Sequence, residues 1–501
     1  MLIKDISKQS LIKLDIINVT FLFLIAMIIG LFLITTTVVI SKDSTIFIEY
    51  AQKFGTSPKQ TMIQEYQHPG YPVLILATSK IIGMFYKTNQ LFLFIYSAQG
   101  AALLCRILTI IVLYFLGKKF VGPRLSLWGV LILILLPKPA EYGSDALSDW
   151  PNMFFIAMGM LLLFYGAKYG KWWFFTLAGL AAGLAYLVRP EGAQIIIYGT
   201  SWLILQLFWK KRTLNISRAV IGLVSMIFIF LIIVTPYMKL KGAILPKKSL
   251  DIFSSIQNSE SKDTSYLNNY NAELIPSDIA EAFLKIFENI GDTLMWVFLV
   301  PYLVGLYLFF KKKKFLEPEQ FFIISLIIIN VPLMIWLHCS HGYMSGRHTL
   351  TLVVFTIFFI PTGLQALATL LNTKYSRGYQ HTHRWFAILM TIGIAICIPK
   401  LFSPLHSDKL VFREAAKWLE ENTEHSAIVG VPDYRISFYA ERIGIKIIDE
   451  NVPQEIQYLV EIIKKKESEQ VQNSREEFEL VFNSESKKEK KEILIFKKVT
   501  Q

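Results

Sequence analysis

Acidic side chains that could accept a proton occur in the polar segments between long apolar runs. Asp43 directly follows the first apolar run, and a carboxylate held there is suited to act as a general base toward a hydroxyl group. The alternative is that Asp43 caps a helix over residues 45–54, because aspartate is a favoured N-cap residue. The two roles are compatible, so Asp43 is the first catalytic candidate.

A turn motif follows in the same polar segment. Two prolines and a glycine in His68-Pro69-Gly70-Tyr71-Pro72 predict a fixed turn that presents His68 and Tyr71. These two side chains could hydrogen-bond a sugar or a phosphate. The alternative is a rigid surface turn that binds nothing.

A second acidic segment carries Asp145 and Asp149. Two acids at this spacing could share one helix face, where they would repel each other unless a cation or a proton lay between them. A divalent metal ion or a substrate hydroxyl would meet that need. For Asp149 we favour the start of a helix at Trp150 and Pro151, because proline suits the first turn of a helix.

Arginine side chains lie at the ends of two apolar runs. Arg189 and Arg347 could hold a phosphate group through paired hydrogen bonds and stabilise charge that develops on it. The alternatives are that both side chains extend to the membrane surface and that Arg189 pairs with Glu191. His348 adjoins Arg347 and is a further candidate for substrate binding.

Metal binding by histidines has weak support. His338 and His341 lie near His348 in the sequence, but their spacing matches no standard zinc pattern. We therefore assign no residue to a metal and expect no certain cofactor. A divalent metal stays open only through the acidic pair described above.

The composition indicates a membrane protein. Of 501 residues, 53% are hydrophobic and 14% aromatic, and the mean hydropathy is +0.45. The formal charge of +13 comes from clusters between apolar runs, without a basic domain that would bind nucleic acid. The three cysteines form no CxxC pair and indicate no disulfide framework.

Apolar runs predict a polytopic helical bundle of about eleven membrane-spanning helices. A further run at 73–86 is short and contains Lys80, which favours an interfacial or re-entrant helix. The predicted spanning runs are 15–41, 91–117, 125–140, 150–167, 172–188, 192–209, 219–238, 292–310, 320–338, 349–372 and 385–402.

Basic clusters fall on alternate loops and predict the orientation, because cationic residues are retained on the cytoplasmic side. We expect a plasma-membrane protein with a cytoplasmic N-terminus and polar loops at 42–90 and 239–291 outside the cytoplasm. The membrane domain covers residues 1–404. Residues 405–501 form a small extracytoplasmic α/β domain, with expected helices at 409–421 and 453–465 and strands at 427–431, 445–448, 478–482 and 493–499.

Taken in order, these motifs resemble the GT-C superfamily of glycosyltransferases. They are similar to glycosyltransferase family 39, which includes the protein O-mannosyltransferases and the lipid A aminoarabinose transferases. The resemblance spans about residues 15–402 and includes Asp43, His68-Pro69-Gly70, residues 183–192 and Ser345-Gly346-Arg347-His348. The mannosyltransferases carry an Asp-Glu pair and a His-Pro-Pro stretch, so the second acid is missing here and Gly70 replaces a proline.

The resemblance implies an inverting transfer of a sugar from a dolichyl- or undecaprenyl-phosphate donor to a hydroxyl group of a glycan, lipid or protein. Asp43 would be the general base, and Arg347 and Arg189 would take up the phosphate charge. Two other functions stay open. One is a transporter of polyprenyl-linked glycans, which would place ionisable residues deep in helices, where few occur beyond Arg106. The other is a glycan polymerase or ligase.

Overall fold

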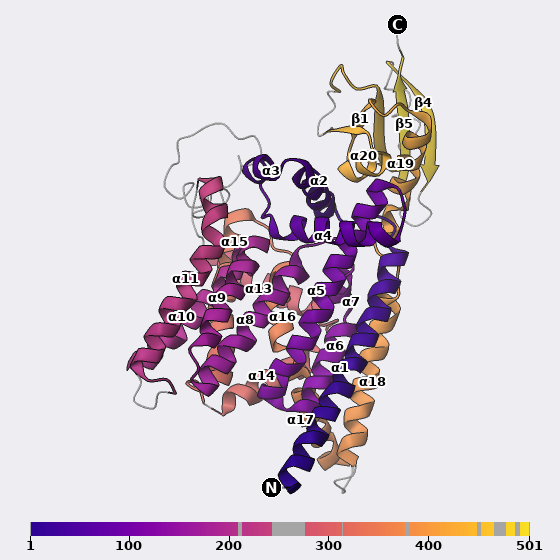
Figure 1. Ribbon diagram of the computed structural model, residues 1–501. Coiled ribbons are helices and arrows are strands. Elements are labelled where there is room, and N and C mark those ends of the chain that lie inside the picture. Colours follow the sequence, from indigo (N-terminus) through magenta and orange to yellow (C-terminus); the bar gives the residue numbers. More distant parts are fainter. Residues whose placement is uncertain are drawn as a thin grey trace.

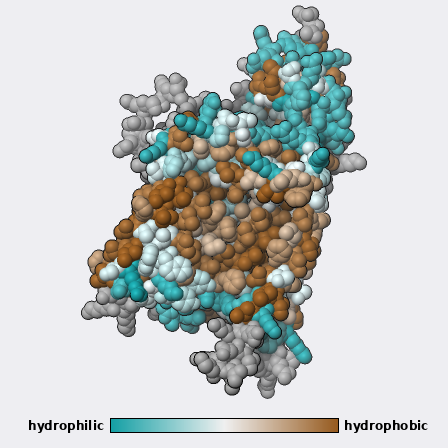
Figure 2. All heavy atoms as spheres, in the orientation of Figure 1, coloured by the Kyte–Doolittle hydropathy of each residue, from teal (hydrophilic) through white to brown (hydrophobic). Residues whose placement is uncertain are grey.

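The structure, a computed structural model, describes residues 2–208, 213–242, 276–312, 314–375, 381–447, 452–464, 477–485 and 491–499. A bundle of long helices carries a small domain with a sheet at one end, and the N-terminus lies at the opposite end (Figure 1). On the face seen in Figure 2, a broad apolar band covers the bundle, whereas the sheet domain is mostly hydrophilic. This division confirms a helical membrane protein with a small C-terminal sheet domain.

Within the described residues, six helices are long and apolar enough to cross a membrane. A seventh span results if the bent pair α16 (Gly346–Thr356) and α17 (Phe359–Tyr375) counts as one. The six are the part Ile12–Thr36 of α1 (Leu2–Thr36), α5 (Gln90–Val121), α8 (Asp149–Tyr169), α11 (Ile216–Lys241), α15 (Pro318–His341) and α18 (His381–Leu401).

Shorter apolar helices complete the bundle, and each of the predicted runs contains a helix. They are α4 (Gly70–Phe85), α6 (Pro123–Leu135), α9 (Trp173–Val188), α10 (Gln194–Phe208) and α14 (Leu299–Lys311). The helix expected at 292–310 begins only at Leu299, because Met295 and Trp296 have φ angles of 55° and 59°. The run 349–372 is likewise divided by a bend of 64°.

Close helix packing explains why small residues occur inside the bundle. A Cβ atom on Gly305 of α14 would lie 1.8 Å from the Phe359 carbonyl oxygen, and one on Gly363 of α17 would lie 1.8 Å from the Pro301 carbonyl oxygen. Only glycine allows the two backbones to approach this closely. Small residues at the interface are a common way for helices to associate in lipid, where no hydrophobic effect draws them together.

Short helices cover the end of the bundle that carries the sheet domain. They are α2 (Lys42–Thr56), α3 (Pro58–Gln64), α7 (Pro137–Tyr142), the 3-10 helix η1 (Pro190–Ala193) and α13 (Pro276–Thr293). Figure 1 shows α2 and α3 above α4 at this end. Most of the predicted outer loop 239–291 lies outside the described residues.

The C-terminal domain has one five-stranded sheet in the order β2-β1-β3-β5-β4. Strand β1 is parallel to its neighbours β2 and β3, and β5 is antiparallel to β3 and β4. The strands are β1 (Ile428–Val431), β2 (Ile443–Lys446), β3 (Tyr458–Lys464), β4 (Phe478–Glu485) and β5 (Lys491–Lys498), and the helices are η2 (Ser407–Lys409), α19 (Leu410–Asn422) and α20 (Tyr434–Ala440).

The helix predicted at 453–465 is wrong, because residues Tyr458–Lys464 form β3. This strand pairs with β5 along its whole length and with β1 at its start. A strand with neighbours on both sides has an almost continuous apolar sequence, which periodicity alone cannot distinguish from a buried helix segment.

Candidate active site

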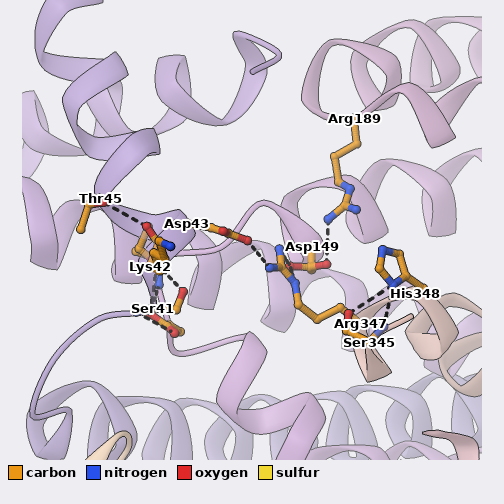
Figure 3. Close-up of polar contacts among 12 residues, drawn as sticks. Ser41, Lys42, Asp43, Thr45, Asp149, Arg189, Ser345, Arg347 and His348 are labelled. Atoms are coloured by element: carbon orange, nitrogen blue, oxygen red, sulfur yellow. Dashed lines mark hydrogen bonds and ion pairs between the residues drawn. The ribbon is translucent and has the colours of Figure 1, made fainter. Parts of the chain in front are cut away.

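Five charged side chains form a connected chain of ion pairs at the end of the bundle. Figure 3 shows four of them: Asp43, Arg347, Asp149 and Arg189. Arg347 lies 2.6 Å from Asp43 (Nη1 to Oδ2) and 2.7 Å from Asp149 (Nη2 to Oδ2). Arg189 Nη1 lies 2.8 Å from Asp149 Oδ1, and its Nη2 lies 3.0 Å from Glu191 Oε1. The structure thus brings together Asp43, Asp149, Arg189 and Arg347, four of the residues singled out from the sequence.

Helix ends place these charges. Asp43 is in the first turn of α2 and Asp149 is the first residue of α8, and the N-terminal ends of helices favour negative charge. Arg189 follows the last residue of α9, where positive charge is favoured. Arg347 is in the first turn of α16, where the helix dipole disfavours a cation, so the carboxylates of Asp43 and Asp149 have to offset that cost.

Exposure separates the roles of the two aspartates. The Asp149 side chain is only 4% exposed and lies between the two guanidinium groups, whereas that of Asp43 is 53% exposed and pairs, among the described residues, with Arg347 alone. A buried carboxylate that bridges two cations is committed to holding them in place. Asp43 is therefore the carboxylate of this set that a substrate can reach most easily.

Arg189 and Glu191, at the opposite end of the ion-pair chain from Asp43, both stay charged. Burial on its own would lower the pKa of Arg189, but Glu191 and Asp149 raise it above its usual range. Burial would likewise raise the pKa of Glu191, and Arg189 holds it below its ordinary value. The pair predicted between Arg189 and Glu191 is confirmed, and Arg189 also bonds Asp149.

Helix α2 begins earlier than expected. Its first residue is Lys42 and its N-cap residue is Ser41, so Asp43 lies inside the first turn and is not the cap of a helix over 45–54. The Asp43 carboxylate instead points toward Arg347 (Figure 3). The capping alternative for Asp43 is therefore wrong.

Asp145 and Asp149 bond different side chains. Asp145 accepts hydrogen bonds from the backbone N–H of Ser41 and the hydroxyl of Ser44, and its Oδ2 lies 3.2 Å from His406 Nε2. The two carboxylates thus have different partners: the His406 ring lies beside Asp145, and two guanidinium groups lie beside Asp149. Among the described residues, no group of three or more His, Cys, Asp or Glu side chains could hold a metal ion.

The two polar side chains of the turn motif, His68 and Tyr71, are buried. His68 is buried, its Nδ1–H donates to the Tyr186 carbonyl at 2.7 Å, and its Nε2 has no hydrogen-bond partner among the described residues. Burial lowers the pKa of His68 to about 4, so the ring is neutral. Tyr71 is fully buried and its hydroxyl donates to the Ala98 carbonyl, which gives it a packing role.

His348 stays next to Arg347 but bonds its own helix start. Its Nδ1 accepts from the Ser345 backbone N–H at 3.1 Å, as part of a capping box at α16. This hydrogen bond fixes the ring beside the ion-pair chain (Figure 3). His338 lies 3.7 Å from Glu281, and the side chain of His341 lies outside the described residues.

Three partners of Asp145 were not predicted from the sequence: Ser41, Ser44 and His406. An ion pair of 3.2 Å between Lys138 and Asp292, at the same end of the bundle, was not predicted either. The signal available for His406 was a histidine where the last apolar run meets the C-terminal tail. Nothing in the local pattern paired it with Asp145, which lies 261 residues earlier.

Part of the chain matches a model of a known protein family. A sequence model described as dolichyl-phosphate-mannose-protein mannosyltransferase matches residues 90–238, which contain Asp149, Arg189 and Glu191. No curated protein sequence matches the chain.

Solved structures share the fold over almost the whole chain. ArnT from Cupriavidus metallidurans bound to undecaprenyl phosphate has a TM-score of 0.57 at 11% identity, covering 95% of this chain and 97% of that chain. The apo oligosaccharyltransferase of Archaeoglobus fulgidus has a TM-score of 0.56 at 11% identity, covering 90% and 70%. The archaeal oligosaccharyltransferase AglB from Archaeoglobus fulgidus, in complex with an inhibitory peptide and a dolichol-phosphate, has 0.53 at 11% identity, covering 89% and 70%.

The family model, over residues 90–238, and the shared fold together support the resemblance to membrane glycosyltransferases of the GT-C superfamily. The resemblance expected from the sequence motifs is confirmed at this level. The ion-pair chain lies on the ends of the helices, at the end of the bundle that also bears the sheet domain.

The difference in exposure predicts opposite stability effects at the two aspartates. Asp149→Ala leaves two guanidinium groups without their buried carboxylate, and breaking a buried ion pair costs about 3–5 kcal/mol. Asp43→Ala breaks a more exposed pair, which contributes about 0–1 kcal/mol. Thermal unfolding in detergent should show a large loss of Tm for Asp149→Ala and a small one for Asp43→Ala. Equal losses would contradict the bridging role of Asp149.

The pair of Asp145 and His406 predicts a pH-dependent stability. Burial alone would lower the pKa of His406, but Asp145, aided by Glu141 and against Arg435, raises it above the ordinary 6.5. Burial alone would raise the pKa of Asp145, but His406 and backbone N–H groups hold it below 3.8. The stabilisation is complete between pH 3.8 and 6.5, and is lost as the pH rises through the pKa of His406 or falls through that of Asp145.

The measurement compares the Tm of the wild type and His406→Ala from about pH 6 to 9, around the ordinary histidine pKa. We expect the difference to shrink as the pH rises. Tyr439→Phe is the control, because burial raises the pKa of Tyr439 to about 12, well above this range. A constant difference for His406→Ala would show that the pair is not charged. Asp408 also faces His406, but it stays ionised throughout this range.

Proposed function

We propose that this GT-C transferase moves a sugar from a polyprenyl-phosphate carrier to a hydroxyl group of a glycan, lipid or protein. The observation that carries the proposal is the chain from the exposed carboxylate of Asp43 to Arg347 and on to Asp149 and Arg189. It combines a proton acceptor with two cations that suit a phosphate. Structures with the same fold contain undecaprenyl phosphate or a dolichol-phosphate, which supports a donor of this class.

The proposed reaction is a single displacement at the anomeric carbon of the sugar. The acceptor oxygen forms a bond to that carbon while the bond from the carbon to the phosphate oxygen breaks, and the electron pair stays on the phosphate. Asp43 takes the proton of the acceptor hydroxyl. Attack opposite the leaving group inverts the anomeric configuration.

Arg347 has two roles in this scheme. The phosphate changes from one negative charge to two as it leaves, so a guanidinium that contacts it stabilises the transition state more than the bound donor. Arg347 also bonds Asp43 directly, and an arriving phosphate competes for the same N–H groups. Donor binding would thus release the Asp43 oxygen to receive the acceptor proton.

Asp149 and Arg189 hold this arrangement. Asp149 fixes Arg347 through contacts of 3.0 Å to Nε and 2.7 Å to Nη2. Arg189 occupies the other oxygen of Asp149, so the carboxylate cannot rotate freely away from Arg347. Catalytic groups held in place by such contacts need little reorganisation during the reaction.

The transporter alternative has less support. Arg106 is fully buried in α5, but its Nη2 donates to the Ile134 carbonyl and its guanidinium lies over the Trp150 ring, which gives it a role in packing. A transporter would also leave the bond between sugar and phosphate intact. A polymerase or ligase would use the same face, and the identity of the donor separates it from the proposed transferase.

We also propose that the active-site end faces away from the cytoplasm at the plasma membrane. Lys42→Cys and Arg124→Cys provide a matched pair, because both positions are exposed and lie on the opposite sides predicted from the basic clusters. In a Cys339→Ser background, a membrane-impermeant maleimide should label Lys42→Cys in intact cells. It should label Arg124→Cys only after permeabilisation. Labelling of Arg124→Cys in intact cells would reverse the proposed orientation.

The central prediction concerns Asp43 as the general base. Asp43→Asn keeps the size of the side chain but cannot accept the proton, and loss of a general base lowers rates by about 100- to 10,000-fold. The assay incubates purified protein with a radiolabelled polyprenyl-phosphate sugar and membrane extract, and measures the label transferred to an acceptor. We expect transfer to collapse while Tm and donor binding stay near wild type. Transfer within a few-fold of wild type would remove Asp43 from the mechanism.

A further inference from the structure

The connector between α1 and α2, residues 37–41, is held by distant parts of the chain. The Val38 N–H donates to the Leu405 carbonyl at 3.1 Å, and the Ile40 N–H donates to the Tyr439 hydroxyl at 3.0 Å. The Ser41 N–H donates to both oxygens of Asp145, at 3.1 and 3.2 Å. Three backbone donors in a short connector are thus satisfied from outside it, two of them by the C-terminal segment.

Asp145 also accepts a hydrogen bond from the first turn of α2. The hydroxyl of Ser44 donates to Asp145 Oδ1 at 3.2 Å and lies 2.9 Å from the hydroxyl of Ser41. Ser41 and Ser44 flank Asp43, so this one buried carboxylate holds the backbone on both sides of the proposed base. Asp145 is 1% exposed, and no solvent competes for these hydrogen bonds.

The C-terminal segment contacts Asp145 through His406. His406 Nε2 lies 3.2 Å from Asp145 Oδ2, and His406 has φ 53° and ψ 34°, in the left-handed region. A residue other than glycine stays in this conformation only when its surroundings hold it there. Here the Leu405 carbonyl and the His406 ring, on neighbouring residues, bond the connector and Asp145.

Apolar packing joins the same elements. Val39 and Ile40 of the connector are fully buried, and they belong to one hydrophobic cluster with Ile436 and Tyr439 of α20. Such a cluster resists separation of the sheet domain from α2, because separation would expose the connector.

We propose that Asp145, His406 and Tyr439 are positioning residues, which set the first turn of α2 so that Asp43 meets Arg347. The C-terminal domain is then a working part of the active site. This inference rests on the proposed function, since it assigns these residues to the base of that reaction. A displacement of about 1 Å at a catalytic group can lower the rate about 100-fold, so loss of these contacts should act on turnover.

The test uses Asp145→Asn, His406→Ala and the milder Tyr439→Phe, which removes only the hydroxyl that accepts from Ile40. The control is Glu441→Ala, which breaks a different contact between the sheet domain and the bundle, the 3.2 Å hydrogen bond that Asn89 Nδ2 donates to Glu441 Oε1. Asn89 is the N-cap residue of α5 and keeps that role, because its Oδ1 accepts from the Leu91 N–H.

Two readouts separate positioning from general stability. In the Cys339→Ser background, a spin label on Lys42→Cys reports the mobility of the first turn of α2 without any need for transfer. Transfer assays over a range of donor concentrations give kcat and KM. We expect the three variants to raise label mobility and to lower kcat about 10- to 100-fold with donor KM near wild type. Glu441→Ala should change neither quantity.

The outcomes separate this inference from the proposed function. Unchanged label mobility in Tyr439→Phe and Asp145→Asn would overturn the positioning role, whether or not the protein transfers sugar. Raised mobility with wild-type kcat would also overturn it. If wild-type protein transfers no sugar, the proposed function fails, while the label still shows whether these contacts hold α2.

Discussion

The candidate active site depends on the buried carboxylate of Asp149 between two guanidinium groups. Arg347 lies where its helix dipole is unfavourable and Arg189 is drawn toward Glu191, so without Asp149 the two cations would repel each other and separate. With Asp149 present, both arginines stay at one end of the bundle and Arg347 keeps a free side for Asp43. Because Asp149 is 4% exposed, water weakens these contacts little.

The solvent of the bundle explains where this site lies. Lipid requires the helices to satisfy their own backbone groups, and a buried charge needs an opposite charge or a backbone carbonyl as its partner, so most charged side chains lie where helices begin and end. Each member of the ion-pair chain lies in the first turn of a helix or directly after the last residue of one. Close packing, such as that between Gly305 and Gly363, keeps these ends at fixed distances.

The sheet domain adds a second layer of constraint to the same end. It shares a hydrophobic cluster with the connector before α2, and its Tyr439 hydroxyl accepts a backbone hydrogen bond there. The bundle therefore supplies the cations and the buried carboxylate, while the contact with the C-terminal segment bears on the helix that carries Asp43. A domain attached in this way would act on the chemistry without contributing a side chain to it.

The sequence alone determined the properties that depend on local composition. Apolar runs predict membrane helices because lipid excludes charge, and the motifs around Asp43, Arg189 and Arg347 predicted the resemblance to the GT-C superfamily and the charged residues that the structure brings together. Only the tertiary structure decided the partners. Asp145 and Asp149 are four residues apart but bond His406 and the arginines, and Arg347 reaches Asp149 across 198 residues. Strand β3 was mistaken for a helix for the same reason, because its identity comes from pairing with β1 and β5. Contacts between distant residues leave no local pattern, so they arise only when the chain is folded.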